Sequence, residues 1–415
     1  MALANIIATN IQNLLDEHKI SVAKLSEYLD VSRQTMTNYL KATSVIDSVQ
    51  LAKTAEFFNV PIEELFVDNS QSKSSTMLFR TALNYSVAID TIQNDVYNYL
   101  KNYLFVANNS NKQTCYFPEQ YNLSVSSTGA SYDINFECQN FFDSKLKLDE
   151  KLKDDIKQIA IEQRQLLDLG DKGAISLISA LSRRGINIIF FDMGDSDISG
   201  LSICDDVKGC FIFVNSNNSM TIERQLFTIA HEYGHIIMHR PIYKRKLYQE
   251  ENSRTNFLDL MANYFAGQLL CPESMLAQYI NLISPIKNDL NAIYRLLLRL
   301  KIKFQVSLQS LLMAFKNIGC IPQQVVSQYF RIIELNGTSK QEPNSIREIE
   351  ELHNLFLYEK TAAINEMIHD IYNKEIVDSS RAKNLLSLFG NNENDKVNKL
   401  IKEWDGLKNI LFAED

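Results

Sequence analysis

The sequence predicts a mostly helical α+β fold with a small β-sheet, divided among several domains. The chain has 415 residues, which is enough for two or three domains that each bury a core. Hydrophobic residues make up 45% of it, and only 13 Gly and 7 Pro interrupt it, a composition typical of a globular, helix-rich protein. Helical periodicity recurs along most of the chain, whereas only two short segments have the pattern of buried strands.

The N-terminal segment, residues 5–66, has the pattern of five short amphipathic helices separated by tight turns. Ser21 is suited to cap the second helix. Residues 32–42 (SRQTMTNYLKA) form a polar third helix and residues 48–60 a fourth, and Pro61 begins a last short one. A second helix of about nine residues, a tight turn and a polar third helix are the parts of a helix-turn-helix.

Residues 23–42 (AKLSEYLDVSRQTMTNYLKA), followed by LAKTAEFFNVPIEELF, resemble an XRE-type domain, the class that includes the Cro and lambda-repressor folds. The resemblance implies a five-helix, lambda-repressor-like domain that binds a double-stranded DNA operator as a homodimer on two half-sites. Its third helix would enter the major groove. Arg and Gln there can pair with base edges, and Ser, Thr, Asn and Lys can hold phosphates. The expected DNA-binding residues are Ser32, Arg33, Gln34, Thr35, Asn38 and Lys41.

The charge balance limits how DNA could be bound. The net charge of -8 argues against coating nucleic acid by bulk electrostatics. Residues 1–69 hold five Lys/Arg against nine Asp/Glu, so a small helical bundle used for protein contact is the alternative interpretation. DNA binding is favoured because the segment from Ser32 to Lys41 contains Arg33 and Lys41 and no acidic residue.

The rest of the chain divides by composition and periodicity. A polar, Ser-rich stretch (DNSQSKSST) indicates a linker. Residues 77–107 have helical periodicity, and residues 108–145 are irregular with short candidate strands. The segments INIIFFDM and CFIFVN have the pattern of two buried strands, bridged by residues 195–209. The tail has amphipathic helical patterns and is interpreted as a cap or an association element. The expected boundaries are 1–68, 69–76 (linker), 77–149, 150–335 and 336–415.

The stretch TIAHEYGHIIMHR, residues 228–240, predicts a metal site on a helix. His231 and His235 are four residues apart, so one helix face presents both to one ion. Glu232 is placed to act as the general base on a water at that ion. Two helix histidines on a solvated face beside an acid are the alternative interpretation. His239 lies one turn further on, too far along the axis to be a third ligand. It is expected beside the ligands or facing substrate, where it could stabilise an oxyanion, and a plain buried, hydrogen-bonded histidine is the alternative.

A catalytic zinc ion usually takes three protein ligands and leaves the fourth position to water. The candidate third ligand is Asp259, near the start of the amphipathic segment FLDLMANYFAGQLLCP. Tyr264 in the same segment is a candidate for stabilising an oxyanion. If Asp259 cannot reach, the alternative ligands are Glu250, Glu251 and Glu273.

ERQLFTIAHEYGHIIMH, followed by LDLMANYFAGQLLCP, resembles the ImmA/IrrE metallopeptidases, which often occur fused to an XRE domain. The resemblance covers most of residues 150–335 and implies a zincin-like metallopeptidase core. Arg224 matches the arginine ahead of the histidine motif, and Ser199 to Ser202 match a strand turn. Asp259 stands where the family normally has Glu. This shorter side chain requires the two helices to lie about one methylene closer together, or a water to intervene.

These observations predict a DNA-binding transcription regulator with a zinc-dependent peptidase domain. The zinc ion would lower the pKa of its water, and Glu232 would pass the proton to the leaving amine. The resemblance implies a repressor-type protein substrate, in a mobile-element, stress or defence response. A non-catalytic zinc-binding regulator and one half of a toxin-antitoxin module are the alternatives.

We expect a cytoplasmic protein that makes no membrane contact. No apolar run approaches the roughly 20 residues of a membrane span, and the N-terminus has no signal-peptide pattern. No C-x-x-C motif occurs, so we expect reduced thiols rather than a zinc ribbon or a disulfide framework. The six cysteines are Cys115, Cys138, Cys204, Cys210, Cys271 and Cys320.

Overall fold

The fold is known from a computed structural model that divides into two contact units, Met1–Ser75 and Thr76–Asp415. The structure describes residues 3–17, 20–58, 62–66, 76–79, 86–110, 116–127, 130–133, 148–194, 198–205, 209–217, 220–240, 257–335, 347–390 and 394–411. No helix in these ranges is long and apolar enough to cross a membrane.

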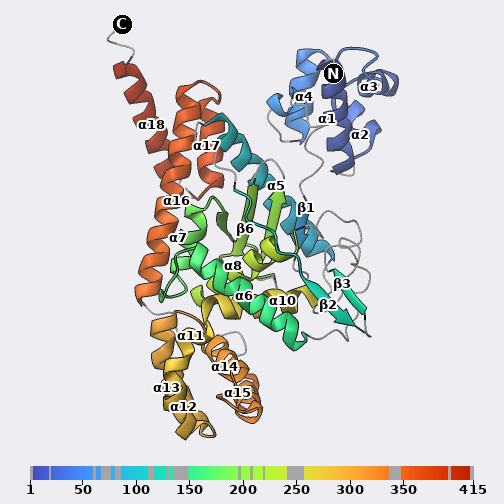
Figure 1. Ribbon diagram of the computed structural model, residues 1–415. Helices are drawn as coiled ribbons and strands as arrows, with labels where there is room; N and C mark the ends of the chain where they lie inside the picture. The colour runs from blue at the N-terminus through green and yellow to red at the C-terminus, as the bar shows by residue number, and fades with distance from the viewer. Residues whose placement is uncertain are drawn as a thin grey trace. The chain divides into compact units, whose positions relative to one another are not determined.

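The first unit is a small helical domain around one core (Figure 1). Its elements are α1 (Leu3–Glu17), α2 (Val22–Tyr28), α3 (Arg33–Leu40), α4 (Ser48–Phe58) and the 3-10 helix η1 (Ile62–Phe66). Apolar residues of these helices and their ends are fully buried, among them Leu25 of α2, its C-cap residue Leu29, and Met36 of α3. The domain therefore contains the predicted five helices, the last of them 3-10.

The turn between α2 and α3 is built from local chemistry. Asp30 has a φ of 54°, a left-handed conformation that a short polar side chain tolerates. Ser32 then caps α3, because its Oγ accepts a hydrogen bond from the Thr35 N–H at 3.0 Å. This tight turn orients α3 against α2 as in a helix-turn-helix.

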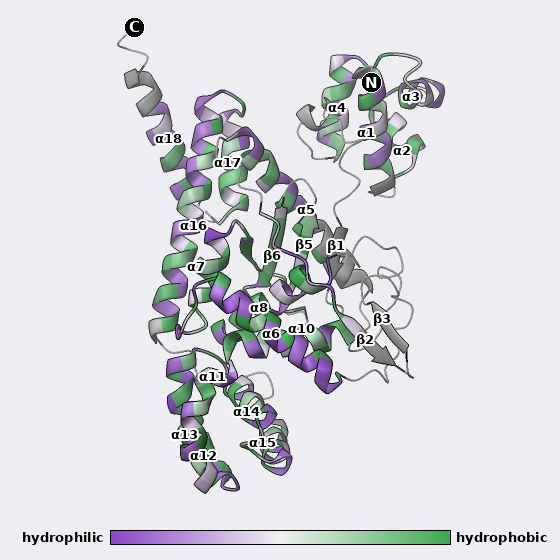
Figure 2. Cartoon of the chain, viewed as in Figure 1, coloured by the Kyte–Doolittle hydropathy of each residue, from purple (hydrophilic) through white to green (hydrophobic). Residues whose placement is uncertain are grey.

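The second unit is built on a four-stranded sheet in the order β1-β5-β6-β4. The strands β4 and β6 are parallel, and the other two pairs are antiparallel. All of β6 is buried, as expected for a central strand covered on both faces, and Figure 2 shows the hydrophobic colouring along the sheet. The bounds are β1 (Thr76–Phe79), β4 (Asn187–Phe191), β5 (Gly200–Asp205) and β6 (Gly209–Asn215).

The sheet differs from the sequence prediction in two places. The bridge between the two predicted strands contains a third strand, β5, because its residues alternate between two covered faces. Residues 77–107 were predicted as continuous helix, but β1 pairs with β5 before α5 (Ser86–Asn109) begins. A separate hairpin joins β2 (Ser124–Ser127) and β3 (Ala130–Asp133).

Helices cover both faces of the sheet, so each face has its own core. Ile188, Ile212 and Val214 pack in one core with residues of α6, α7, α8 and α10. Phe211 and Phe213 face the other core, with α5, α17, α18 and part of α16. The bounds are α6 (Glu150–Leu166), α7 (Ser176–Arg183), α8 (Ile222–Met238), α10 (Phe257–Leu270), α16 (Arg347–Asn373), α17 (Ser379–Leu388) and α18 (Asn394–Leu411).

A helical segment follows α10 and adds to the core that contains Ile188, Ile212 and Val214. It comprises α11 (Glu273–Leu276), η5 (Ala277–Tyr279), α12 (Ile280–Ile283), η6 (Ser284–Ile286), α13 (Leu290–Phe304), α14 (Leu308–Asn317) and α15 (Gln323–Leu335). A buried ion pair connects it to α8, because Lys301 Nζ lies 3.0 Å from Glu223 Oε1. Together with α16 to α18, these helices confirm a mostly α fold with a small sheet.

Candidate metal centre

The helix α8 carries the histidine motif through the middle of the second unit. It begins where Thr221 caps the Arg224 N–H and ends at His239. From Leu226 to Met238 nearly every side chain is buried, because the sheet covers one side of α8 and α10 the other. A helix that is apolar on most sides forms only when it is enclosed in this way, so the histidines lie in the interior.

Close packing between α8 and α10 depends on small residues. A Cβ added to Gly234 would lie 2.8 Å from Phe265 Cδ1 and 3.5 Å from the Cα of Ala262. Contacts below 3 Å are not tolerated in a packed core. Gly234 and Ala262 therefore allow α10 to approach α8, and this approach brings Asp259 to the histidines.

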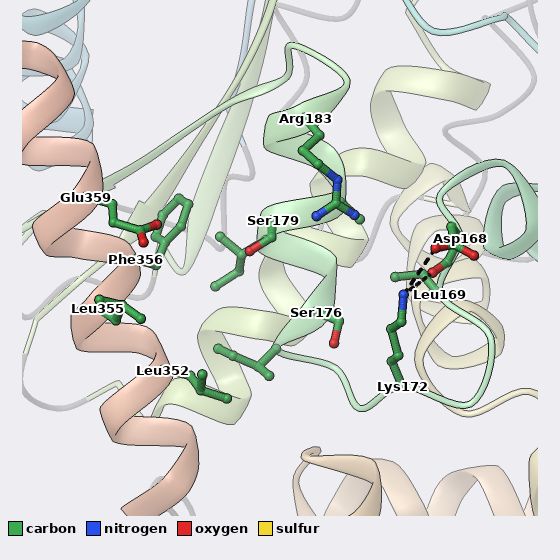
Figure 3. A pocket seen from close by; sticks show the side chains of 13 residues that line it. Asp168, Leu169, Lys172, Ser176, Ser179, Arg183, Leu352, Leu355, Phe356 and Glu359 are labelled. Atoms are coloured by element: carbon green, nitrogen blue, oxygen red, sulfur yellow. Dashed lines mark hydrogen bonds and ion pairs between the residues drawn. The ribbon is translucent and has the colours of Figure 1, made fainter.

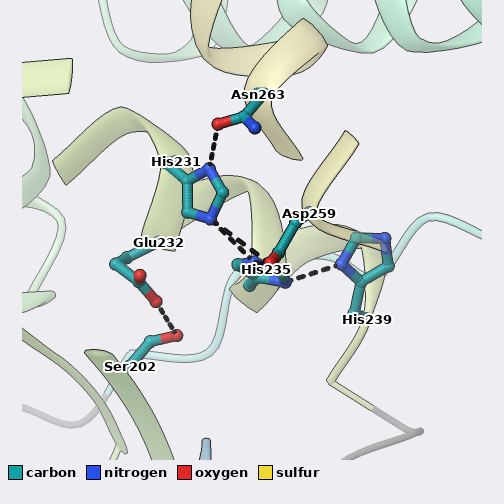
Figure 4. Close-up of polar contacts among 7 residues, drawn as sticks. All are labelled: Ser202, His231, Glu232, His235, His239, Asp259 and Asn263. Carbon is teal, nitrogen blue, oxygen red and sulfur yellow. Dashed lines mark hydrogen bonds and ion pairs between the residues drawn. The ribbon is translucent and has the colours of Figure 1, made fainter. Parts of the chain in front are cut away.

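Three side chains converge at this interface (Figure 4). His235 Nε2 lies 3.0 Å from His231 Nε2 and 3.2 Å from Asp259 Oδ1, and His231 Nε2 lies 3.8 Å from the same oxygen. One ligand atom from each residue lies within 4.8 Å of the others. Ligands about 2.0–2.1 Å from a tetrahedral zinc ion would be about 3.3 Å apart, so the donor set fits such an ion. The aspartate reaches the histidines without a longer side chain.

The other nitrogen of each histidine has its own partner. His231 Nδ1 lies 2.8 Å from Asn263 Oδ1, and His235 Nδ1 lies 2.9 Å from His239 Nδ1. Such bonds favour the tautomer with the proton on Nδ1, in which the lone pair of Nε2 can coordinate a metal. Burial, together with the neighbouring His235, holds the pKa of His239 well below its usual value. A neutral His239 can accept the proton that His235 Nδ1 donates.

 The carboxylate of Glu232, the candidate general base, is held from the sheet side, where Ser202 Oγ of β5 donates a hydrogen bond to Glu232 Oε2 at 2.8 Å. Both side chains are buried. Close approach of α8 to β5 depends on Gly200, because a Cβ there would collide with Thr228 and with the Phe213 carbonyl oxygen. The base candidate is therefore fixed in position beside the histidines.

The remaining candidates lie elsewhere. Tyr264 is partly buried, and burial followed by the nearby Glu273 raises its pKa to about 12. Its role as a stabiliser of an oxyanion stays a prediction. Glu273 forms an ion pair with Lys157 of α6, and Glu250 and Glu251 lie outside the described residues. Of the two acids that the structure describes, Asp259 and Glu273, Asp259 is the one that lies at the histidines.

Two partners of the site were missed from the sequence. Asn263 follows Asp259 by four residues, so both lie on one face of α10, and this spacing was the available signal. Ser202 was matched only as part of a strand turn, and its contact with Glu232 joins residues 30 positions apart. Arg224 of α8 also reaches the sheet, because its Nη2 donates to Ser199 Oγ at 3.0 Å.

In the first unit, the candidate DNA-binding residues gather on and around α3. Arg33, Gln34 and Lys41 are exposed. Gln34 Nε2 donates to Asn38 Oδ1 at 3.2 Å, and the Ser32 and Thr35 hydroxyls lie 2.8 Å apart. The side chains of these two pairs are engaged with each other on the helix, and the exposed cations Arg33 and Lys41 are the strongest candidates for base or phosphate contact.

A pocket of about 310 Å³ lies between α7 and α16 (Figure 3). Leu352, Leu355 and Phe356 line one side, and Ser176 and Ser179 line the other. None of the three metal-ligand candidates lines it, so this pocket is separate from the metal centre.

Comparison with known families assigns both parts of the chain. Residues 10–71 match the Cro/C1-type HTH DNA-binding domain, and residues 181–316 match a peptidase family described as the IrrE N-terminal-like domain. The chain thus contains one segment similar to a Cro/C1-type HTH domain and another similar to an IrrE N-terminal-like domain. The second match extends from the end of α7 to α14 and includes β4 to β6, α8 and α10. No curated protein and no solved structure matches the chain.

These matches confirm the resemblances inferred from the sequence. They support a DNA-binding regulator with a peptidase-like domain. The candidate His231, His235 and Asp259 cluster lies within the matched range of that domain.

Proposed function

We propose that the IrrE-like domain is a zinc-dependent peptidase that cleaves a repressor-type protein, and that the HTH domain binds an operator as a homodimer. The convergence of two histidine nitrogens and an aspartate oxygen within 4.8 Å, beside a buried glutamate, carries this proposal. Two neutral nitrogens and one carboxylate oxygen are a ligand set typical of catalytic zinc.

The protein's own residues perform the proton transfers. Glu232 accepts a proton from the attacking water and delivers it to the leaving amine. Ser202 holds one carboxylate oxygen and so limits the rotation of Glu232. When bound at the three ligands, zinc supplies Lewis-acid activation of the water and of the scissile carbonyl.

The test combines metal analysis with cleavage assays. The substrates are the full chain itself and the repressors encoded beside its gene, each with and without a chelator. We expect Glu232→Gln to retain zinc and to lose cleavage by about 10²-fold or more, because a general base typically contributes that much. Asp259→Ala should lose zinc, whereas the matched control Glu273→Gln should keep both zinc and cleavage, since Glu273 pairs with Lys157.

The opposite result identifies the competing function. If Glu232→Gln keeps both zinc and the full effect of the protein in cells, hydrolysis is not its role. The chain is then a regulator with a structural or sensory zinc centre.

The DNA-binding part has a separate test. Arg33→Ala should weaken binding to double-stranded fragments selected by the full chain, by about 1–3 kcal/mol if Arg33 contacts a base. Lys53→Ala on α4 is the control and should change binding little. Unchanged affinity for Arg33→Ala at low salt would count against α3 as the recognition helix. Sedimentation with and without DNA would measure the proposed dimer.

A further inference from the structure

Two cysteines lie opposite each other on β5 and β6, which are neighbouring strands of the sheet and consecutive in the chain. Cys204 of β5 and Cys210 of β6 are direct partners in the antiparallel register. Their Sγ atoms lie 2.7 Å apart. Directly opposite residues in such a pair have Cα atoms about 4.5–5.5 Å apart, within the range that a disulfide spans. A bond between these thiols therefore requires little movement of the backbone.

The pair belongs to the core that α6, α7, α8 and α10 form on one face of the sheet. Cys210 is fully buried and Cys204 is 7% exposed, so Cys204 is the sulfur that a small oxidant reaches first. The two other described cysteines have different surroundings. Cys271 lies beside Arg164, and burial raises its pKa to about 12, while Cys320 donates a weak hydrogen bond to the Ile318 carbonyl.

We propose that Cys204 and Cys210 are a redox modification site that forms a reversible disulfide with hydrogen peroxide. The Cys204 thiolate attacks the peroxide, an S–O bond forms, the O–O bond breaks, and a sulfenic acid and water result. The Cys210 thiolate then attacks that sulfur, the S–S bond forms and the second oxygen leaves as water. The two thiols lose two electrons and two protons, and one peroxide becomes two waters.

The site shares a strand with the metal centre. Ser202 and Cys204 are two residues apart on β5, so both point to the face covered by α8. Ser202 is the residue that bonds Glu232. The proposed disulfide therefore links β5 to β6 at a position two residues from Ser202, which holds the glutamate. The modification itself needs neither metal nor DNA, and so goes beyond the proposed function.

Peptide mapping of the full chain tests the proposal directly. Lys208 is the one trypsin site between the two cysteines, and digestion places them in the peptides 185–208 and 209–224, each with a single cysteine. After peroxide treatment and alkylation under denaturing conditions, we expect these two peptides as one linked species. Its mass should be two hydrogens below the sum, and dithiothreitol should release both peptides.

Variants separate this bond from other oxidation. Cys204→Ser and Cys210→Ser should each abolish the linked species, whereas the control Cys320→Ser should retain it. Recovery of both wild-type peptides as separate alkylated thiols or as sulfonic acids would overturn the proposal. A link to another cysteine, or one between differently isotope-labelled chains, would also overturn it. These wild-type measurements hold even if a serine variant fails to fold.

Discussion

At the scale of single residues, the side chains that hold the candidate ligands in position are expected to affect metal affinity along with the ligands themselves. Asn263 Oδ1 lies 2.8 Å from His231 Nδ1 and fixes the ring so that Nε2 faces the cluster. We expect Asn263→Ala to weaken zinc binding by about 10–100-fold, the usual effect of removing such a partner. Competition with a chelator would measure it. Asn263→Asp keeps an acceptor oxygen and should retain more affinity than the alanine variant.

Lys360 of α16 is expected to make the free energy of unfolding depend on pH. Burial lowers its pKa from 10.5 to about 7, so between these values the unfolded chain binds more protons than the folded one. The free energy of unfolding contributed by this group therefore rises with pH through that window, with a limiting slope of about 1.4 kcal/mol per pH unit.

Lys360→Met should remove this slope and stabilise the protein near pH 7. Urea unfolding between about pH 7 and pH 9 would measure both effects. The exposed Lys402 of α18 supplies the control, because Lys402→Met should leave the slope as it is. Equal slopes for wild type and Lys360→Met would contradict the assignment.

At the scale of elements, the contact between α8 and α10 sets the metal geometry. Gly234→Ala should raise helix propensity by about 1 kcal/mol, yet its Cβ would collide with Phe265 and push α10 away from α8. We expect weaker zinc binding together with lower stability. Gly267→Ala is the matched control, since a Cβ there meets nothing within 4 Å. It should stabilise α10 by about 0.5–1 kcal/mol and leave zinc affinity unchanged.

The same elements show what the sequence could predict. Local patterns sufficed for α3, α8 and α10, because capping residues and helical spacing act within a few positions. The strand β5 was missed because small residues such as Ser202 occupy its helix-covered face and resemble a loop. The pairing of β1 with β5 joins residues more than a hundred positions apart, and no local pattern reports such a contact.

The candidate site, like the fold, was predicted from local patterns only where its residues lie close together in the sequence. His231, Glu232 and His235 belong to one helix, so their spacing alone placed them together. Asp259 came from a second helix through family resemblance, and the structure supplies the packing that brings it within 3.2 Å of His235. The opposition of Cys204 and Cys210 depends on strand register, which spacing in the sequence does not define.

At the scale of the whole molecule, the two proposed binding functions belong to different compact units, Met1–Ser75 and Thr76–Asp415. A ligand stabilises only the unit whose folded form binds it, by about 2.7 kcal/mol at a hundredfold excess over its Kd. Calorimetry should therefore resolve two transitions, of which zinc raises one and a selected DNA fragment raises the other. Asp259→Ala should abolish the zinc response and leave the DNA response intact. A single transition that rises with either ligand would show instead that the two units unfold together, and that occupancy of one site is transmitted to the other.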